Sequence, residues 1–256
     1  MQRTSHLALG LGAVLVVVGG GALQSCGGSG GGGSGVGGGG TPPPPPAQTA
    51  LPMALAPGQL GLSGNLDGAT GTTRVAPKQF VVWGGEVADG YTWTFTPGEV
   101  QPLSVSLNPQ TGVIGGGGSL QPGTHTVFVT VSDLKGTQRS FQAPINVSMC
   151  NSQTGPVCGL PVFQGVSAAV VALLDADESF EYAASLLAEG GTPPYSWSVA
   201  SGNLPPGMVL SASRGVVRGK PLAGSANQTY TFTVQIQDSA GNTAIGTNRY
   251  SIRVVP

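Results

Sequence analysis

The sequence has few charges and almost no histidine, and both shortages restrict its chemistry. Only 8% of its 256 residues are charged, and the formal net charge is −1. No basic stripe offers the electrostatic footprint of a nucleic-acid-binding protein, so we expect no nucleic-acid partner. Of the two histidines, His6 lies in a segment that we expect to be removed, which leaves His125. One histidine excludes a two-histidine zinc site and makes any histidine-dependent nucleophile rest on that residue alone.

Phosphate-binding chemistry is also missing. The glycine runs at 27–40 and 115–118 lack the following Lys-Ser/Thr pair and the strand–helix setting of a phosphate loop. We therefore expect no catalytic residues, no enzymatic activity and no cofactor, with calcium as the one candidate ligand ion considered below.

Cysteine is scarce, with Cys26, Cys150 and Cys158 the three present. Cys26 ends the tetrapeptide Leu23-Gln24-Ser25-Cys26, which follows a start carrying Arg3 and an apolar stretch over 7–23. A charged start, an apolar stretch and a small residue at the cleavage point are typical of a secretory signal peptide, here residues 1–25. An uncleaved membrane helix is the alternative, because the apolar run approaches the length of a membrane span.

The tetrapeptide resembles the lipobox of bacterial lipoproteins. The resemblance implies that Cys26 becomes the lipidated N-terminus and that acyl chains such as palmitate hold the protein on a membrane. Gly27 follows the cysteine, where an aspartate would retain a lipoprotein in the inner membrane. By the same resemblance we expect the bacterial outer membrane, with the periplasmic or surface face left open.

Residues 26–50 are expected to be the lipidated cysteine and a linker. Gly27–Gly40 is almost pure glycine and serine, a composition that forms a flexible coil spanning roughly 20 Å. Pro42–Pro46 follows, which favours a stiff extended rod. The two segments together fit a tether that lifts a domain from a membrane, although an unselected linker would have the same composition.

The rest of the chain contains an internal repeat. Tyr91–Phe95 matches Tyr195–Val199, and Thr124–Asp133 matches Thr229–Asp238. The two units predict two domains, residues 51–149 and 150–256.

The repeated segments have the period-two alternation of β-strands. In the second copy Tyr230, Phe232, Val234 and Ile236 fall on one face, with threonine and glutamine on the other. Turn-forming residues recur at the short spacing of a β-sandwich. One segment, Ser179–Glu189, fits either a helix or a strand.

Four segments of the second unit carry a family resemblance: 190–197, 204–210, 215–221 and 229–242. Together they resemble the immunoglobulin-like repeat of bacterial surface proteins, a family related to cadherin-like sandwiches. The resemblance implies an all-β fold of two tandem immunoglobulin-like sandwiches after a Gly/Pro-rich tether. The first unit is divergent, because Val100–Leu103 stands where the second has Leu204-Pro205-Pro206-Gly207.

Cys150 and Cys158 lie between the two units. Export favours a disulfide between them, which would contribute about 2–3 kcal/mol on the chain-entropy model. A reactive or metal-binding pair is the alternative.

Two other features could bind ligands. Asp175, Asp177 and Glu178 cluster with Glu181, and such oxygen-rich clusters can bind calcium, although a solvated loop has the same composition. Trp93 and Trp197 occupy equivalent places and are expected in the two cores, whereas Trp83 has no counterpart and is the better candidate for an exposed, glycan-binding ring.

These observations predict a non-catalytic, lipid-anchored module of the bacterial cell envelope that mediates protein interaction or adhesion. A carbohydrate-binding surface lipoprotein and a calcium-dependent adhesion module are the alternatives. The partner, an envelope protein or a glycan, is not determined by the sequence.

Overall fold

The computed structural model describes residues 53–55, 61–102, 104–150, 163–166 and 168–256. All described residues belong to one compact unit, Pro46–Pro256. Within the described ranges every regular element is a β-strand, which confirms the all-β class. The ambiguous segment Ser179–Glu189 forms two short strands and no helix.

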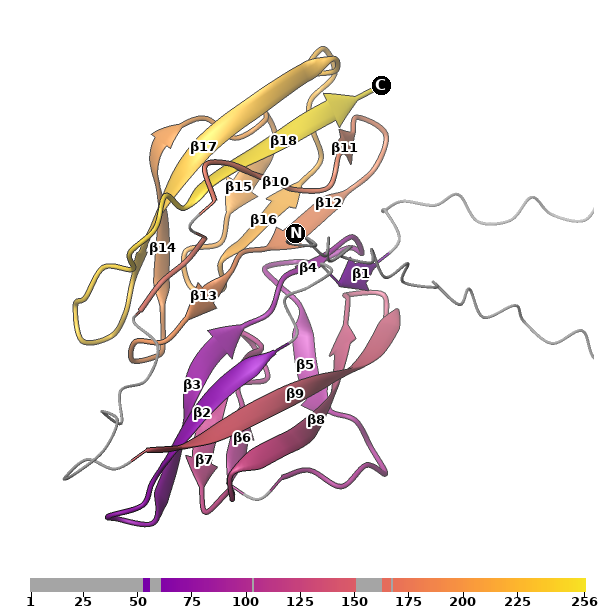
Figure 1. Ribbon diagram of the computed structural model, residues 1–256. Helices are drawn as coiled ribbons and strands as arrows, with labels where there is room; N and C mark the ends of the chain where they lie inside the picture. The colour runs from indigo at the N-terminus through magenta and orange to yellow at the C-terminus, as the bar shows by residue number, and fades with distance from the viewer. Residues whose placement is uncertain (1–52, 56–60, 103, 151–162, 167) are drawn as a thin grey trace, which may run out of the picture. The chain divides into compact units, whose positions relative to one another are not determined.

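The first repeat is built on one continuous strand order, β5-β8-β9-β2-β3-β7-β6 (Figure 1). Its β2 pairs in parallel with β9 and antiparallel with β3, so this strand links the two halves of the sandwich. The strands of this repeat are β1 (Ala54–Leu55), β2 (Leu62–Asp67), β3 (Thr72–Gln79), β4 (Val82–Trp83), β5 (Thr92–Phe95), β6 (Val105–Leu107), β7 (Val113–Gly118), β8 (Gly123–Ser132) and β9 (Gln138–Cys150).

The second repeat has two sheets. One contains β10, β18, β17 and β14 in that order, with β11 also paired to β18. The other has the order β1-β4-β12-β16-β15, so it also includes two strands of the first repeat. The strands of this repeat are β10 (Val171–Ala172), β11 (Ala176–Asp177), β12 (Tyr182–Ser185), β13 (Ala188–Glu189), β14 (Ser196–Gly202), β15 (Met208–Leu210), β16 (Val216–Gly219), β17 (Gln228–Gln237) and β18 (Arg249–Val255).

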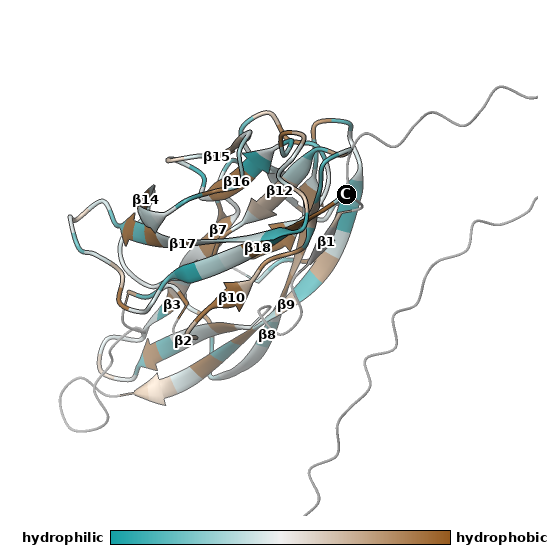
Figure 2. Cartoon of the chain, turned by 90° about the horizontal axis from the view of Figure 1, so that it is seen from above, coloured by the Kyte–Doolittle hydropathy of each residue, from teal (hydrophilic) through white to brown (hydrophobic). Residues whose placement is uncertain are grey.

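The long hairpin strands show the expected alternation. In β17 the side chains of Phe232, Val234 and Ile236 are buried, whereas the intervening Gln235 and Gln237 are exposed. The longest strand, β9, alternates in the same way, and Figure 2 shows this as bands of teal and brown along it. One face of each strand therefore faces a core and the other faces water.

The two repeats share a glycine turn that is hydrogen-bonded to a tyrosine. Each has a Gly-Gly turn with positive φ angles, Gly84-Gly85 in the first repeat and Gly190-Gly191 in the second. The Tyr91 hydroxyl donates to the carbonyl of Gly84 at 2.8 Å, and the Tyr195 hydroxyl donates to that of Gly190 at 2.7 Å. The repeat found in the sequence is thus a repeat of structure.

Each core also contains a tryptophan packed on a glycine. Trp93 is 2% exposed and Trp197 is 3% exposed, as expected for core residues. A Cβ atom on Gly112 would lie 2.3 Å from the ring of Trp93, and one on Gly215 would lie 2.4 Å from the ring of Trp197. Glycine is therefore required at both positions, because a side chain there would overlap the indole.

Candidate functional site

Several predicted sites fall outside the described residues. These are the signal peptide over 1–25, the lipidation site Cys26, the linker over 26–50 and Cys158. Cys150 is described: it ends β9 and is buried. Lipidation and the disulfide therefore stay predictions.

The apolar run over 7–23, for which an uncleaved membrane helix was the alternative to a signal peptide, lies outside the described residues. No helix in the described ranges is long and apolar enough to cross a membrane.

The acidic cluster does not form a shared site. Asp175 accepts a hydrogen bond from Nε of Arg253 at 3.0 Å, and Asp177 accepts one from the backbone N–H of Ser179. Glu178 turns instead toward the backbone N–H of Ala226. Across the described part of the chain, no group of three or more acidic, histidine or cysteine side chains is placed to hold a metal. The geometry gives the calcium hypothesis no support.

Trp83 is not the freely exposed ring that was expected. It is partly buried in β4 and packs against the hydrophobic cluster of the second repeat. The reason is that β4 pairs with β12 of that repeat, which places Trp83 opposite Ala184. A glycan-binding role for Trp83 stays a prediction.

His125 has a structural partner. Its Nε2 lies 2.7 Å from the carbonyl oxygen of Gln121, and the residue is partly buried at the start of β8. Burial raises the pKa of the hydroxyls of Tyr91, Tyr182, Tyr195 and Tyr250. These hydroxyls therefore stay protonated at neutral pH, and those of Tyr91 and Tyr195 donate the hydrogen bonds to Gly84 and Gly190 described above.

Strand pairing that the sequence does not predict joins the two repeats. Strand β4 of the first repeat pairs antiparallel with β12 of the second, and β13 of the second pairs antiparallel with β3 of the first. Ala184 faces Trp83, Ala188 faces Gln79 and Glu189 faces Lys78, so one register runs through both pairings. We call the segments 77–84 and 183–190, with the pairing between them, the inter-repeat ladder.

The inter-repeat ladder is symmetric. Gly84 and Gly190 are equivalent residues, and each donates its N–H to the other repeat: Gly84 to Ala183 at 2.8 Å and Gly190 to Pro77 at 2.7 Å. By the same correspondence Lys78 is equivalent to Ala184, and Trp83 is equivalent to Glu189. The paired residues Lys78 and Glu189 therefore correspond to the paired residues Ala184 and Trp83. The contact is therefore isologous, like the interface of a two-fold dimer, although it lies within one chain.

Ser185 holds the centre of the ladder. Its Oγ donates to the carbonyl of Phe80 at 2.8 Å and accepts the backbone N–H of Val82 at 2.7 Å. Ser185 is 1% exposed and both Phe80 and Val82 are fully buried. These backbone groups have no access to water, so the hydroxyl supplies a partner that they would otherwise lack.

Ion pairs flank this contact. Nζ of Lys78 lies 3.7 Å from the carboxylate of Glu189, with both side chains largely buried. Asp89 of the first repeat lies 3.1 Å from Nε of Arg214 and 3.7 Å from a terminal nitrogen of Arg218, both in the second. Apolar packing continues across as well: Ala183 and Val216 belong to the core cluster of the first repeat, and Val113 belongs to that of the second.

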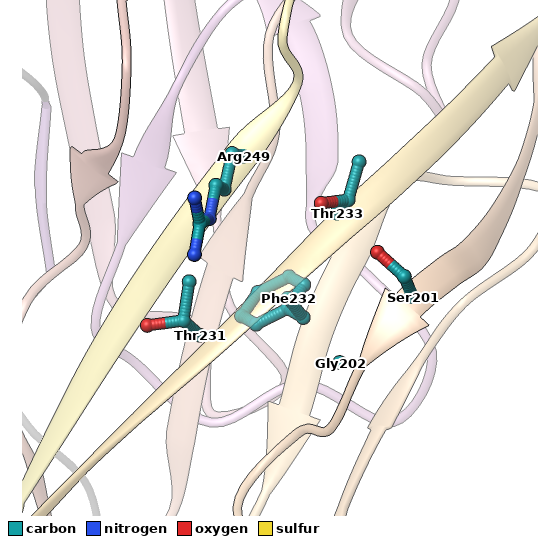
Figure 3. Close-up of a pocket in the computed structure, with 6 residues that line it drawn as sticks. All are labelled: Ser201, Gly202, Thr231, Phe232, Thr233 and Arg249. Atoms are coloured by element: carbon teal, nitrogen blue, oxygen red, sulfur yellow. The ribbon is translucent and has the colours of Figure 1, made fainter.

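A separate hollow lies on the outer face of the second repeat (Figure 3). It has a volume of about 270 Å³ and is bounded by three strands, β14, β17 and β18. Figure 3 shows the side chain of Arg249 directed along the sheet toward Thr231. The residues that line it are Ser201, Gly202, Thr231, Phe232, Thr233 and Arg249.

Residues 161–255 match the family described as Putative Ig domain, which confirms the expected resemblance over the second repeat. No curated protein matches the sequence.

Solved structures with similarity include the endo-fucoidan hydrolase MfFcnA4 from glycoside hydrolase family 107, at 16% identity and a TM-score of 0.33. The match covers 79% of this chain but spans only 28% of that enzyme. The protocadherin GammaB4 extracellular domain matches at 12% identity and a TM-score of 0.29, covering 80% of this chain and 35% of its own. Human protocadherin-24 EC1-2 matches at 13% identity and a TM-score of 0.28, covering 80% of this chain and 99% of its own.

Proposed function

We propose that this chain is a non-catalytic, lipid-anchored module of the bacterial cell envelope that presents two immunoglobulin-like repeats to a partner as one rigid arm. The inter-repeat ladder carries the proposal. Repeats connected only by a flexible linker reorient freely, but these two share backbone hydrogen bonds, a buried serine and apolar packing. A rigid pair holds its binding surface at a defined position, which reduces the entropy lost when a partner binds.

The anchor is the part of this proposal that derives from the sequence. Cys26 would be acylated after removal of residues 1–25, and the Gly/Pro-rich segment would separate the repeats from an outer membrane. Two or three acyl chains hold a protein stably, because each buried methylene contributes about 0.8 kcal/mol.

The anchoring test compares the wild-type chain with Cys26→Ser in a Gram-negative host supplied with labelled palmitate. We expect the wild type to carry label and to sediment with outer membranes, and the variant to be unlabelled and recovered in the soluble periplasmic fraction. An unlabelled wild type, or a variant that still sediments with membranes, would overturn the anchor.

The binding role is tested by site-specific photo-crosslinking in intact cells. The crosslinker replaces one exposed apolar residue at a time: Val100 or Leu134 in the first repeat, and Val209 or Leu222 in the second. A partner held on one surface of a rigid arm predicts a discrete adduct from some of these positions only. The absence of an adduct from every position, or equal smears from all four, would contradict a specific partner.

A further inference from the structure

We propose that the hollow between β14, β17 and β18 is a binding site for an oxyanion, a carboxylate, sulfate or phosphate group. This inference deepens the proposed binding role and rests on it. Its test uses the purified chain, so a failure here would leave the anchor and the rigid arm as they stand.

Three polar side chains form a row across the sheet. Ser201 of β14 pairs directly with Thr233 of β17, and Thr233 pairs directly with Arg249 of β18. Directly opposed residues lie on the same face of a sheet, with Cβ atoms about 4.5–5.5 Å apart. Thr231 lies two residues along β17 and is therefore on this face too. Together with Thr231, the row combines one guanidinium with three hydroxyl groups.

A glycine and an irregularity in β14 border the hollow in which the row lies. The pairing of β14 with β17 shifts register between Val199 and Ser201. Gly202 follows with a φ of 77°, and a Cβ there would lie 2.2 Å from the carbonyl oxygen of Thr231. Glycine at this position therefore lets the backbone of β14 approach that of β17 closely at the border of the hollow. The hollow of about 270 Å³ exceeds the roughly 30 Å³ that one water occupies in the liquid, so it can hold an anion of several heavy atoms.

The charge in the hollow is positive and unbalanced. Among the described residues Arg249 has no carboxylate partner, and no acidic side chain lines the hollow. Arg253, four residues further along the same strand and on the same face, instead pairs with Asp175 through Nε at 3.0 Å. A guanidinium offers five donors in a planar fork that fits two oxygens of one oxyanion, and hydroxyl groups supply further donors. This set of groups suits an anion and repels a cation.

The test titrates the purified chain, without residues 1–26, with sodium sulfate, inorganic phosphate or acetate at constant ionic strength, and follows amide chemical shifts by NMR. Glucose serves as the neutral control. We expect saturable shifts at Thr231, Thr233 and Arg249 with at least one of the anions and none with glucose. Comparing the three anions identifies which oxyanion group fits. Shifts that rise linearly without saturation for all three anions would contradict a site.

Two arginine variants separate a built site from general positive charge. Arg249→Gln should weaken binding at least about tenfold, because it removes a charged donor pair. Arg253→Gln removes the same charge from the same face, but from a side chain that already pairs with Asp175, and should bind as the wild type does. Thr233→Val, which keeps the shape and removes a hydroxyl, should weaken binding several-fold. Equal losses in both arginine variants, or no loss in Arg249→Gln, would overturn the proposal.

Discussion

At the scale of single residues, the fold depends on positions where only one residue type fits. Gly112 and Gly215 lie under the two core tryptophans and have φ angles of 71° and 63°. They combine a backbone conformation that L-residues rarely adopt with a contact that excludes a Cβ. Because both repeats use this device, it belongs to the repeat itself and not to one copy.

Replacing Gly215 tests this packing. Gly215→Ala should destabilise the protein by the strain of a positive φ, about 1–2 kcal/mol, and by overlap with Trp197, about 1–3 kcal/mol more. Gly241→Ala is the matched control, since Gly241 also has a positive φ but no atom within 4 Å of an added Cβ. Urea unfolding should show a clearly larger loss for the first variant. Equal losses would mean that contact with the ring is unimportant.

Asp238 is a second residue with a structural task. Its carboxylate accepts backbone N–H groups from Thr192 at 3.0 Å, Ala240 at 3.1 Å and Asn242 at 2.8 Å. Burial would raise the pKa of this carboxyl, but the hydrogen bonds to Asn242, Thr192 and Ala240 outweigh it and hold the pKa below the usual value. The carboxylate therefore ties the β17–β18 turn to the Gly-Gly turn of its repeat.

The pH dependence of stability follows from that direction. A carboxyl with a lowered folded pKa stabilises the fold above its unfolded value, near 4, and the contribution disappears as pH falls through the folded value. Asp238→Asn should therefore lower the free energy of unfolding at pH 7, and the difference from wild type should shrink as the pH falls below about 4 and through the lowered folded pKa. A difference that stays constant over this range, measured by urea unfolding, would show that the charge of Asp238 is not involved.

For the acidic cluster we predict that calcium has no effect on stability. Because Asp175, Asp177 and Glu178 have separate protein partners, we expect the same melting temperature in millimolar calcium and in chelator. A clear rise of the melting temperature with calcium would show that these carboxylates rearrange into a site.

At the scale of elements, the strand alternation was predictable and the inter-repeat ladder was not. The period-two pattern of Tyr230–Gln237 reflects one buried and one wet face, and this is visible in the sequence. The run Phe80–Trp83 lacks alternation, which is the signal of a strand buried on both faces. The sequence of this run does not indicate that it pairs with β12, because the pairing uses backbone groups and the small side chain of Ser185. The expected exposure of Trp83 failed for this reason.

The residues that line the hollow could also be predicted only in part from the sequence. The sequence places Thr231 and Thr233 on the wet face of their strand, and the structure agrees. It cannot place Ser201 or Arg249 beside them, since that depends on the register of three strands and on the irregularity in β14. Registers between strands separated by long loops are set by tertiary packing.

Ser185 allows the ladder to be tested as an element. Ser185→Ala leaves the backbone N–H of Val82 without its partner in a buried place, which should cost about 1–3 kcal/mol. Ser198→Ala, at an exposed position in β14, is the control and should be close to neutral. Thermal and urea unfolding give the comparison. A neutral Ser185→Ala would mean that another group satisfies Val82.

At the scale of the whole unit Pro46–Pro256, the two repeats act as one body if the ladder persists in solution. The contact places equivalent segments of the two repeats against each other, so a duplicated domain has kept the symmetry of a dimer within one chain. Shared backbone pairing and apolar clusters that include residues of both repeats predict that the repeats are stabilised together.

The most direct measurement of this claim is amide hydrogen exchange at Gly84 and Gly190, whose N–H groups bond across the repeats to Ala183 and Pro77. A stable ladder predicts that both amides exchange as slowly as the amide of Trp93, which bonds to Pro109 within the first repeat. If Gly84 and Gly190 exchange rapidly while Trp93 remains protected, the repeats are folded but not joined, and the rigid arm is contradicted.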